Sequence, residues 1–236
     1  MTSGPPIVEI KGVRKNYSAL RPLRMNSLVV APAERVAVAG LDSTAAELVV
    51  NLVTGATLPD EGEIQVFGRR TADVVDGEAW LASLDRFGIV SDRAVLLEGS
   101  TLVQNITLPF TLEIDPVSPE MRAQVVGLAT ECGIENEWLE QPAAALPPGV
   151  RARVHFARAI ALGPALLLME HPTAALPQGE RGAFGQVVVR VCDARGLTTV
   201  MMTNDAEFAE IAAHRIVTLQ PATGELAPKK RRWLKF

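Results

Sequence analysis

Short apolar runs alternate with helical patterns along most of the chain. In the first third, periodicity and turn residues predict strands at residues 7–13, 28–30, 35–39 and 62–68. A helix is expected at residues 45–54. Asp42, Ser43 and Thr44 are its candidate N-cap residues, and Gly55 is its expected stop. A buried strand that leads through a glycine into a helix is the first landmark of the chain.

The middle and last thirds differ in pattern. From about residue 92 to 141 there is little strand signal, and Ser118 with Pro119 predicts the start of a helix that stops at Gly133. The last third then predicts helices at 152–162, 179–194 and 206–213 and strands at 165–169, 197–203 and 215–219. Strands that alternate with helices favour a mostly parallel sheet covered on both faces.

Composition limits the possible functions. The 236 residues are 48% apolar, which suits a packed core. The net charge is −4 and the pI is near 5.5, so we expect no nucleic-acid partner. Cys132 and Cys192 are expected to be buried, reduced thiols. Because we find no signal-peptide pattern and no apolar run long enough to span a bilayer, a cytoplasmic protein is expected, with any membrane role coming through a partner.

Seven segments occur in an order that is similar to one family. They are KNYSAL with Tyr17, RVAVAGLDSTAAELVVNLVTG, LPDEGEIQVFG, FGIVSD with VLLEGSTLVQNITLPF, QPAAALPPGVRARVHFARAIALGP, ALLLMEHPTAALP and VMMTND. Together they resemble the ATP-binding subunits of ABC transporters over almost the whole chain, and look most like the lipid and lipoprotein exporter ATPases.

The resemblance implies an architecture. We expect one α/β domain over residues 1–236 with the P-loop NTPase fold of ABC ATPases. Residues 1–91 and 151–236 would form its core, with a small antiparallel β subdomain near the N-terminus, and residues 92–150 would form a helical subdomain.

The phosphate loop implied by the resemblance reads Gly40-Leu41-Asp42-Ser43-Thr44-Ala45-Ala46-Glu47. A working loop needs backbone N–H groups, a lysine for the terminal phosphates and a hydroxyl for Mg²⁺. Here Ala45 stands at the second glycine, Ala46 at the lysine and Glu47 at the hydroxyl. One charge pair at about 4 Å is worth roughly 4 kcal/mol at an effective dielectric of about 20, so Glu47 opposes phosphate, and Asp42 adds repulsion. No cofactor is therefore expected, or only weak binding of ATP and Mg²⁺, and the loop would be kept for its shape.

The resemblance also locates the hydrolytic groups. Glu170 and His171 stand where the family has the Asp of the metal's water shell and the Glu that polarises the attacking water. Asn204 stands where the family has the switch histidine, and Asp92 where it has the glutamine that senses Mg²⁺. Pro177 stands where the family has the aspartate of the loop after the acidic strand. No catalytic residue is therefore expected, and Glu170, His171 and Asn204 are altered positions. Tyr17 stands where an aromatic ring stacks on adenine.

The family's signature motif, Leu-Ser-Gly-Gly-Gln, binds the ATP of the opposing subunit. Here it reads Leu146-Pro147-Pro148-Gly149-Val150, and proline has no N–H to donate. Both halves of a composite site are thus altered. The helix that follows carries three arginines, which we interpret as a solvated or interface face: Arg151, Arg153 and Arg158.

Three functions stay open. The leading hypothesis is a non-hydrolysing scaffold or regulator that binds a membrane permease, a second ABC ATPase or a second copy of itself at the inner face of the membrane. The second is an ATPase with a rearranged site that uses Glu47, Glu170 and His171. The third is a free-standing interaction module. The basic tail at residues 229–236 is interpreted either as a contact for a membrane or partner or as a solubilising end.

Overall fold

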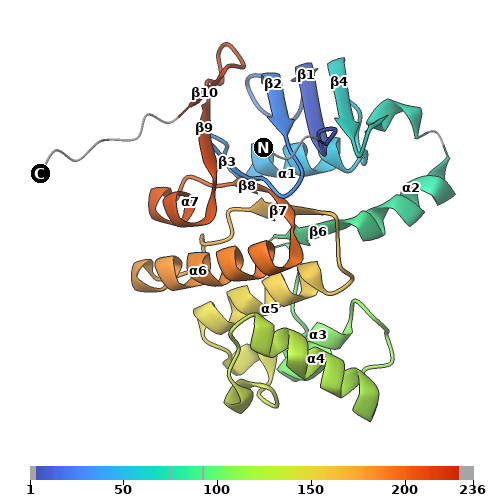
Figure 1. Ribbon diagram of the computed structural model, residues 1–236, viewed down its shortest axis with the longest axis vertical. Helices are drawn as coiled ribbons and strands as arrows, with labels where there is room; N and C mark the ends of the chain where they lie inside the picture. The colour runs from blue at the N-terminus through green and yellow to red at the C-terminus, as the bar shows by residue number, and fades with distance from the viewer. Residues whose placement is uncertain (1–3, 75, 92, 229–236) are drawn as a thin grey trace, which may run out of the picture.

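The computed structural model describes residues 4–74, 76–91 and 93–228, and Figure 1 shows their arrangement. The strands are β1 Val8–Lys15, β2 Leu23–Val30, β3 Arg35–Ala39, β4 Glu61–Val66, β5 Arg69–Arg70, β6 Phe87–Val90, β7 Leu166–Glu170, β8 Thr198–Met202, β9 Arg215–Leu219 and β10 Leu226–Pro228. The α-helices are α1 Ser43–Val53, α2 Gly77–Ser83, α3 Leu102–Thr107, α4 Pro119–Glu131, α5 Pro148–Ile160, α6 Gln178–Arg195 and α7 Ala206–Ala212. Four 3₁₀ turns lie between them, at Thr71–Asp73, Leu84–Arg86, Asn136–Trp138 and Ala143–Ala145.

A six-stranded sheet forms the centre of the molecule, in the order β10-β9-β3-β8-β7-β6. Strands β9, β3, β8, β7 and β6 pair in parallel, and β10 pairs antiparallel to β9. The carboxyl ends of the parallel strands therefore lie at one edge, where loops in α/β proteins bring functional groups together.

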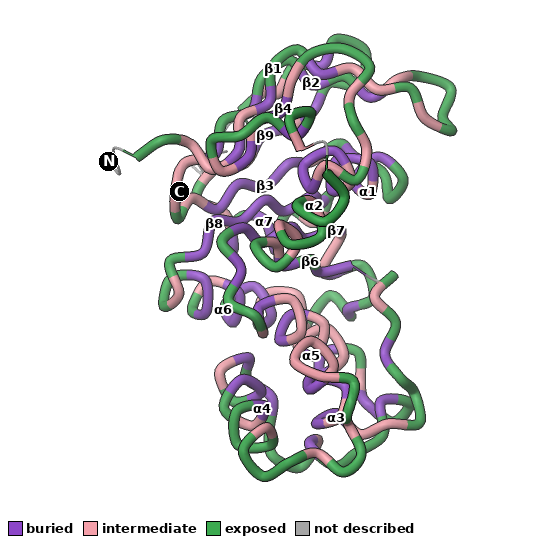
Figure 2. The backbone as a smooth tube through the Cα atoms, turned by 90° about the vertical axis from the view of Figure 1, so that its right-hand side faces the viewer, coloured by how far each residue is buried: buried purple, intermediate pink, exposed green. Residues whose placement is uncertain are grey.

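Side chains of the central strands pack into two layers. Along β7, Leu166 and Leu168 face the cluster that contains α1, while Leu167 and Met169 face the cluster that contains α3 to α6. Successive side chains of a strand point to opposite faces, so one buried strand serves both cores. Figure 2 shows β3, β7 and β8 as buried segments between these layers.

A second, four-stranded antiparallel sheet has the order β2-β1-β4-β5. Its buried residues join those of α1 and of the central sheet in one cluster. Helix α1 thus lies between the two sheets, as Figure 1 shows, and its N-terminus is held at the carboxyl edge of the parallel strands.

Several sequence predictions are confirmed. The strands at Arg35–Ala39 and Arg215–Leu219 have their predicted bounds. Ser118 caps α4 by accepting from the Met121 N–H, and Gly133 follows that helix with a φ of 72°. The α/β class, the parallel sheet and the small antiparallel sheet are also as expected.

Other predicted bounds are wrong. Strand β2 begins at Leu23, five residues before the expected start, because it pairs with β1 through to Lys15. Helix α5 begins at Pro148 instead of residue 152, since proline is accommodated in the first helical turn. The pattern missed α2, which has no buried residue, the six-residue α3 and the three-residue β10.

Two further observations concern membrane-spanning helices and the predicted residues that the structure does not describe. Within the described ranges, no helix combines the length and apolarity that crossing a bilayer requires. The basic tail, residues 229–236, and Asp92 lie outside the described residues. The predictions about them stay predictions.

Both cysteines are buried free thiols, as expected. Burial raises the pKa of Cys132 to about 12 and also raises the pKa of Cys192. Since the thiolate is the reactive form, the native protein should not react with a thiol reagent such as DTNB at pH 8. Two thiols should react after denaturation. Fast labelling of the native protein would contradict this burial.

Asp60 anchors the segment before Tyr17. Its carboxylate accepts the Asn16 backbone N–H at 2.7 Å and pairs with Lys15 Nζ at 2.8 Å. These contacts lower the pKa of Asp60 to about 2, the backbone hydrogen bond contributing most. A lowered pKa contributes stability above the unfolded value near 3.8, and this contribution is lost as the pH falls towards about 2.

The variant Asp60→Asn should therefore be less stable than the wild type at neutral pH. The difference in urea midpoint should stay constant above about pH 5 and shrink as the pH falls below about 4. A gap that is independent of pH down to pH 2 would show that the carboxylate charge does not contribute.

Candidate functional site

Four loops meet at the carboxyl edge of the parallel strands. Gly40 follows β3, Ser91 follows β6, Glu170 ends β7 and Asn204 lies two residues after β8. A cavity of about 470 Å³ opens at this edge. It is lined by Asp42, Ser43, Glu170, His171, Thr173, Ala174, Arg181, Thr203, Asn204 and Asp205. Five of the predicted site residues therefore share one cavity, although they are spread over more than 160 positions of the sequence.

Asp42 is the N-cap residue of α1. Its Oδ1 accepts the Ala45 N–H at 2.8 Å, and its backbone carbonyl accepts the Ala46 N–H at 2.9 Å. The first N–H groups of a helix are the donors that bind an anion in a phosphate loop. Here the chain's own carboxylate takes the Ala45 donor, so Asp42 acts as an internal anion at the helix terminus.

Gly40 is required by the backbone. Its φ is 87°, and a Cβ at this position would lie 2.7 Å from the Leu219 carbonyl oxygen of β9. Only glycine combines that conformation with such a close approach. The glycine that matches the phosphate-loop motif thus has a packing reason that does not involve a ligand.

The side chain of Asn204 is hydrogen-bonded to the same loop. Its Oδ1 accepts the Gly40 N–H at 2.8 Å, and its Nδ2 donates to the Leu41 carbonyl at 2.8 Å. Both polar groups of the side chain are therefore engaged with the chain itself. The amide holds the loop after β3 against the end of β8.

The remaining loop residues have few polar groups to offer a ligand. Ala45 and Ala46 are buried, Ser43 and Thr44 are exposed, and Glu47 is partly exposed. Ser43 lines the cavity, whereas Thr44, Ala45, Ala46 and Glu47 do not. Where the motif would place a lysine beside the phosphates, Ala46 contributes only a methyl group to the core beneath α1.

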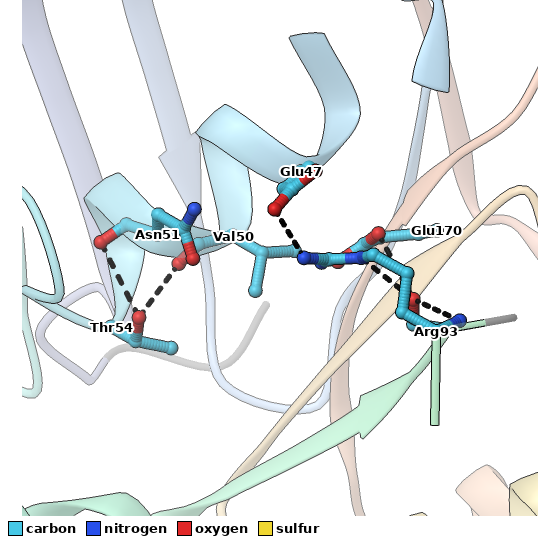
Figure 3. A network of polar contacts seen from close by, with 7 residues as sticks. Glu47, Val50, Asn51, Thr54, Arg93 and Glu170 are labelled. Carbon is cyan, nitrogen blue, oxygen red and sulfur yellow. Dashed lines mark hydrogen bonds and ion pairs between the residues drawn. The ribbon is translucent and has the colours of Figure 1, made fainter. Parts of the chain in front are cut away.

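Glu47 and Glu170 are joined by one arginine. Arg93 Nη1 is paired with Glu47 Oε1, and Arg93 Nη2 lies 2.5 Å from Glu170 Oε1. Ser91 Oγ donates to Glu170 Oε2 at 3.2 Å. Figure 3 shows the guanidinium between the two carboxylates. Arg93 was missed by sequence reasoning because its partners lie 46 and 77 positions away and no local pattern marks it.

His171 adopts an unusual conformation at the end of β7. Its φ is 41°, and its N–H donates to the Met202 carbonyl at 2.8 Å. A left-handed conformation is uncommon for a non-glycine residue and marks a functional or strained position. The Nε2 atom is buried, and no hydrogen-bond partner is found for it in the described part of the chain.

A second polar cluster, around Asp205, also lines the cavity. Asp205 caps α7 through the Phe208 N–H, accepts the Thr173 hydroxyl at 2.8 Å and lies 3.5 Å from Arg181 Nη1. With Asp42 and Glu170 also present, acidic groups outnumber Arg181 and Arg93 around the cavity. This balance disfavours a highly anionic ligand.

Tyr17 is half-buried and packs against the cluster that contains α1. Burial raises the pKa of the Tyr17 phenol, and the charge of Asp42 raises it further. The ring therefore packs beside the loop after β3, and its stacking on adenine stays a prediction.

The signature segment lies at the start of α5. Pro147 is the N-cap residue and provides no side-chain cap, and Pro148 is in the first turn. A Cβ on Gly149 would lie 2.1 Å from Glu180 Oε2, so a carboxylate of α6 packs against this helix end. Arg151 pairs with Glu98 at 2.6 Å, and Arg158 donates to the Val95 carbonyl, so two of the three arginines link α5 to the loop before α3.

The residues present do not fit Mg·ATP as the family motif holds it. Asp42 accepts an N–H group that a phosphate would use, and Ala46 provides no ammonium group. Arg93 lies between Glu47 and Glu170, which stand where the family has the groups that hold Mg²⁺. In the described ranges, no group of three or more His, Cys, Asp and Glu side chains is arranged to hold a metal ion.

Comparisons with known proteins identify relatives. The Fe(3+) ions import ATP-binding protein FbpC of Mesorhizobium japonicum is 29% identical over 229 residues, which are 97% of this chain and 62% of the relative. The methionine import ATP-binding protein MetN of Brucella abortus is 29% identical over 91% of this chain and 57% of the relative. This chain therefore spans about three fifths of the length of these curated relatives. The finer likeness to lipid and lipoprotein exporters stays a prediction.

Solved structures show the same fold. The dimeric structure of MJ0796, described as a bacterial ABC transporter cassette, matches with a TM-score of 0.75 at 24% identity, covering 93% of this chain and 96% of that one. The family model described as ABC transporter matches residues 23–174. That match spans more than half of the chain and includes the loop after β3, the start of α5 and the end of β7. The chain therefore belongs to the ABC transporter family.

Proposed function

We propose that this protein is an ATP-binding-type subunit of an ABC transporter that does not hydrolyse ATP and acts as a scaffold or regulator of its complex. The observation that carries the proposal is the occupation of the α1 N-terminus by Asp42, which accepts the Ala45 N–H. Phosphate would have to displace a carboxylate that is covalently part of the loop. The absence of an ammonium group at Ala46 removes the attraction that would offset this cost.

The loss of hydrolysis is supported separately by the groups at the strand ends. Glu170 is paired with Arg93 and Ser91, and Asn204 is hydrogen-bonded to the loop after β3. Groups engaged in this way are not free to hold a metal's water shell or to contact a terminal phosphate. Glu170 and Asn204 therefore stabilise the carboxyl edge of the sheet in this proposal.

A protein partner is supported by apolar surface near the loop after β6. Ile89 and Leu162 are exposed and line a second cavity of about 230 Å³ with Ala94 and Pro109. The neighbouring Val95 is 72% exposed. Exposed apolar side chains that gather in this way mark protein contacts. The two import proteins among the relatives suggest a membrane permease as the occupant, with a second ABC ATPase or a second copy of this chain as the other subunit, at the inner face of the membrane.

We also propose that residues 92–150 form a helical subdomain on a core made of residues 1–91 and 151–236. Helices α3 and α4 lie in that segment, and among its described residues the only strand pairing is an isolated bridge between Thr101 and Pro142. The buried residues of this segment join those of α5, α6 and the central sheet in one cluster, so the proposed subdomain packs directly on the core.

One observation favours a second function, an ATPase with a rearranged site. His171 lines the larger cavity, is held at a φ of 41°, and carries a buried Nε2 that no described residue contacts by a hydrogen bond. A neutral imidazole in such a place can accept a proton from water. Turnover of Mg·ATP that is lost in His171→Ala would establish this function in place of the first.

Isothermal titration with Mg·ATP tests the proposal. The wild type should give no heat and no thermal stabilisation at millimolar Mg·ATP, because the charges of the loop repel phosphate. A hydrolysing ABC ATPase run in parallel gives the positive control. Binding in the micromolar range, or turnover above background, would contradict the proposal.

The role of Asp42 is tested by a matched pair of variants. Asp42→Gly frees the Ala45 N–H, so weak binding of inorganic phosphate or ATP should appear. Asp76→Gly removes a similar cap, in which Asp76 accepts from Glu78 at the start of α2 away from the site, and should bind neither. Equal behaviour of the two variants would show that Asp42 does not block the helix terminus.

A further inference from the structure

Glu170 is a buried carboxylate whose charge must be neutralised. It ends β7, and its side chain is only 6% exposed. A carboxylate removed from water is costly unless a cation and hydrogen bonds surround it. Ser91 Oγ donates to one of its oxygens and Arg93 Nη2 to the other.

The same guanidinium reaches a second carboxylate on another element. Arg93 Nη1 pairs with Glu47 of α1, while its Nε lies 3.3 Å from Ser91 Oγ. Arg93 itself belongs to the loop after β6, and its backbone N–H also donates to Ser91 Oγ at 3.2 Å. One rigid, planar cation thus connects α1, the loop after β6 and the end of β7 (Figure 3).

The position between two carboxylates that come from separate elements is one that a divalent cation would take. We propose that Arg93 is a built-in substitute for that ion: its guanidinium neutralises Glu47 and Glu170 and fixes α1 to the ends of β6 and β7 with no metal or nucleotide present. The inference rests on the proposed function, because it assumes that this edge no longer holds Mg·ATP.

This arrangement has a consequence for assembly. In a site that is closed by a bound ion, the loop after β6 is held only while the ion is present. An arginine in the chain supplies this contact without a bound ion. Because the loop leads into Ala94 and Val95, beside the apolar surface described above, the surface offered to a partner is then independent of nucleotide.

Thermal unfolding without nucleotide tests the bridge. Arg93→Ala should lower the Tm by about 5–10 °C, because it leaves the Glu170 carboxylate buried and unpaired. Arg122→Ala is the matched control. Arg122 has the same 46% side-chain exposure and the same 2.5 Å contact, but its partner Glu140 is 61% exposed instead of 6%. That variant should lose less than about 2 °C.

A double variant separates charge compensation from packing and remains informative if Arg93→Ala fails to fold. Arg93→Ala with Glu170→Gln removes the cation together with the buried charge, so it should be more stable than Arg93→Ala alone. A double variant that is no more stable than the single one would overturn the proposal.

Manganese ions test the substitution itself. Millimolar Mn²⁺ should recover part of the lost Tm in Arg93→Ala, should not do so when Glu47→Gln is added, and should leave the wild type unchanged. No recovery in Arg93→Ala, or an equal gain in the wild type, would overturn the proposal.

These experiments contain no nucleotide. A wild type that binds Mg·ATP would refute the proposed function, whereas unfolding at equal temperatures in Arg93→Ala and Arg122→Ala would refute only the role of Arg93.

Discussion

A carboxylate buried at the end of a parallel strand is costly unless a cation and hydrogen bonds surround it. The polar side chains at this edge of the sheet are arranged around that requirement. Glu170 is placed there by β7, whose five residues are all buried. Its partner Arg93 lies in the loop after the neighbouring strand β6 and also pairs with Glu47 on α1. The contact therefore joins the central sheet to the helix that supports the antiparallel sheet.

Polar groups at this edge are satisfied mainly by the chain itself. Asp42 caps α1, Asn204 holds the loop after β3, and Asp205 is bound by Thr173 and by the start of α7. A site that awaits an anionic ligand would leave donors free and place cations around the cavity. Here carboxylates and one amide occupy those places. The fold of the family is retained, and under the proposed function the charges that a nucleotide would bring are supplied internally.

Sequence reasoning identified the fold because buried strands leave a strong local signal. The run RVAVA and its glycine predicted β3 and the turn to α1, and the apolar run before Glu170 predicted β7. It also gathered Asp42, Ser43, Glu170, His171 and Asn204 into one site, since family motifs fix the order of these loops. Helix α2 was missed because none of its residues is buried, so no apolar stripe exists to detect.

The contacts within the site could not be predicted in the same way. Arg93 carries no motif, and its role depends on the distance between strands that are adjacent only in the folded sheet. Asn204 was expected to be an altered position at the switch histidine, and the structure adds that its side-chain amide is hydrogen-bonded to Gly40 and Leu41. Asp42 was expected to repel phosphate, and the structure adds that its carboxylate accepts the Ala45 N–H at the start of α1.

A crystal structure of the protein grown with millimolar Mg·ATP tests the central claim most directly. The account predicts that Asp42 Oδ1 still accepts the Ala45 N–H, that Arg93 still lies between Glu47 and Glu170, and that the loop after β3 holds no nucleotide. Phosphate density against the Ala45 and Ala46 N–H groups, with Arg93 displaced by a metal ion, would contradict it.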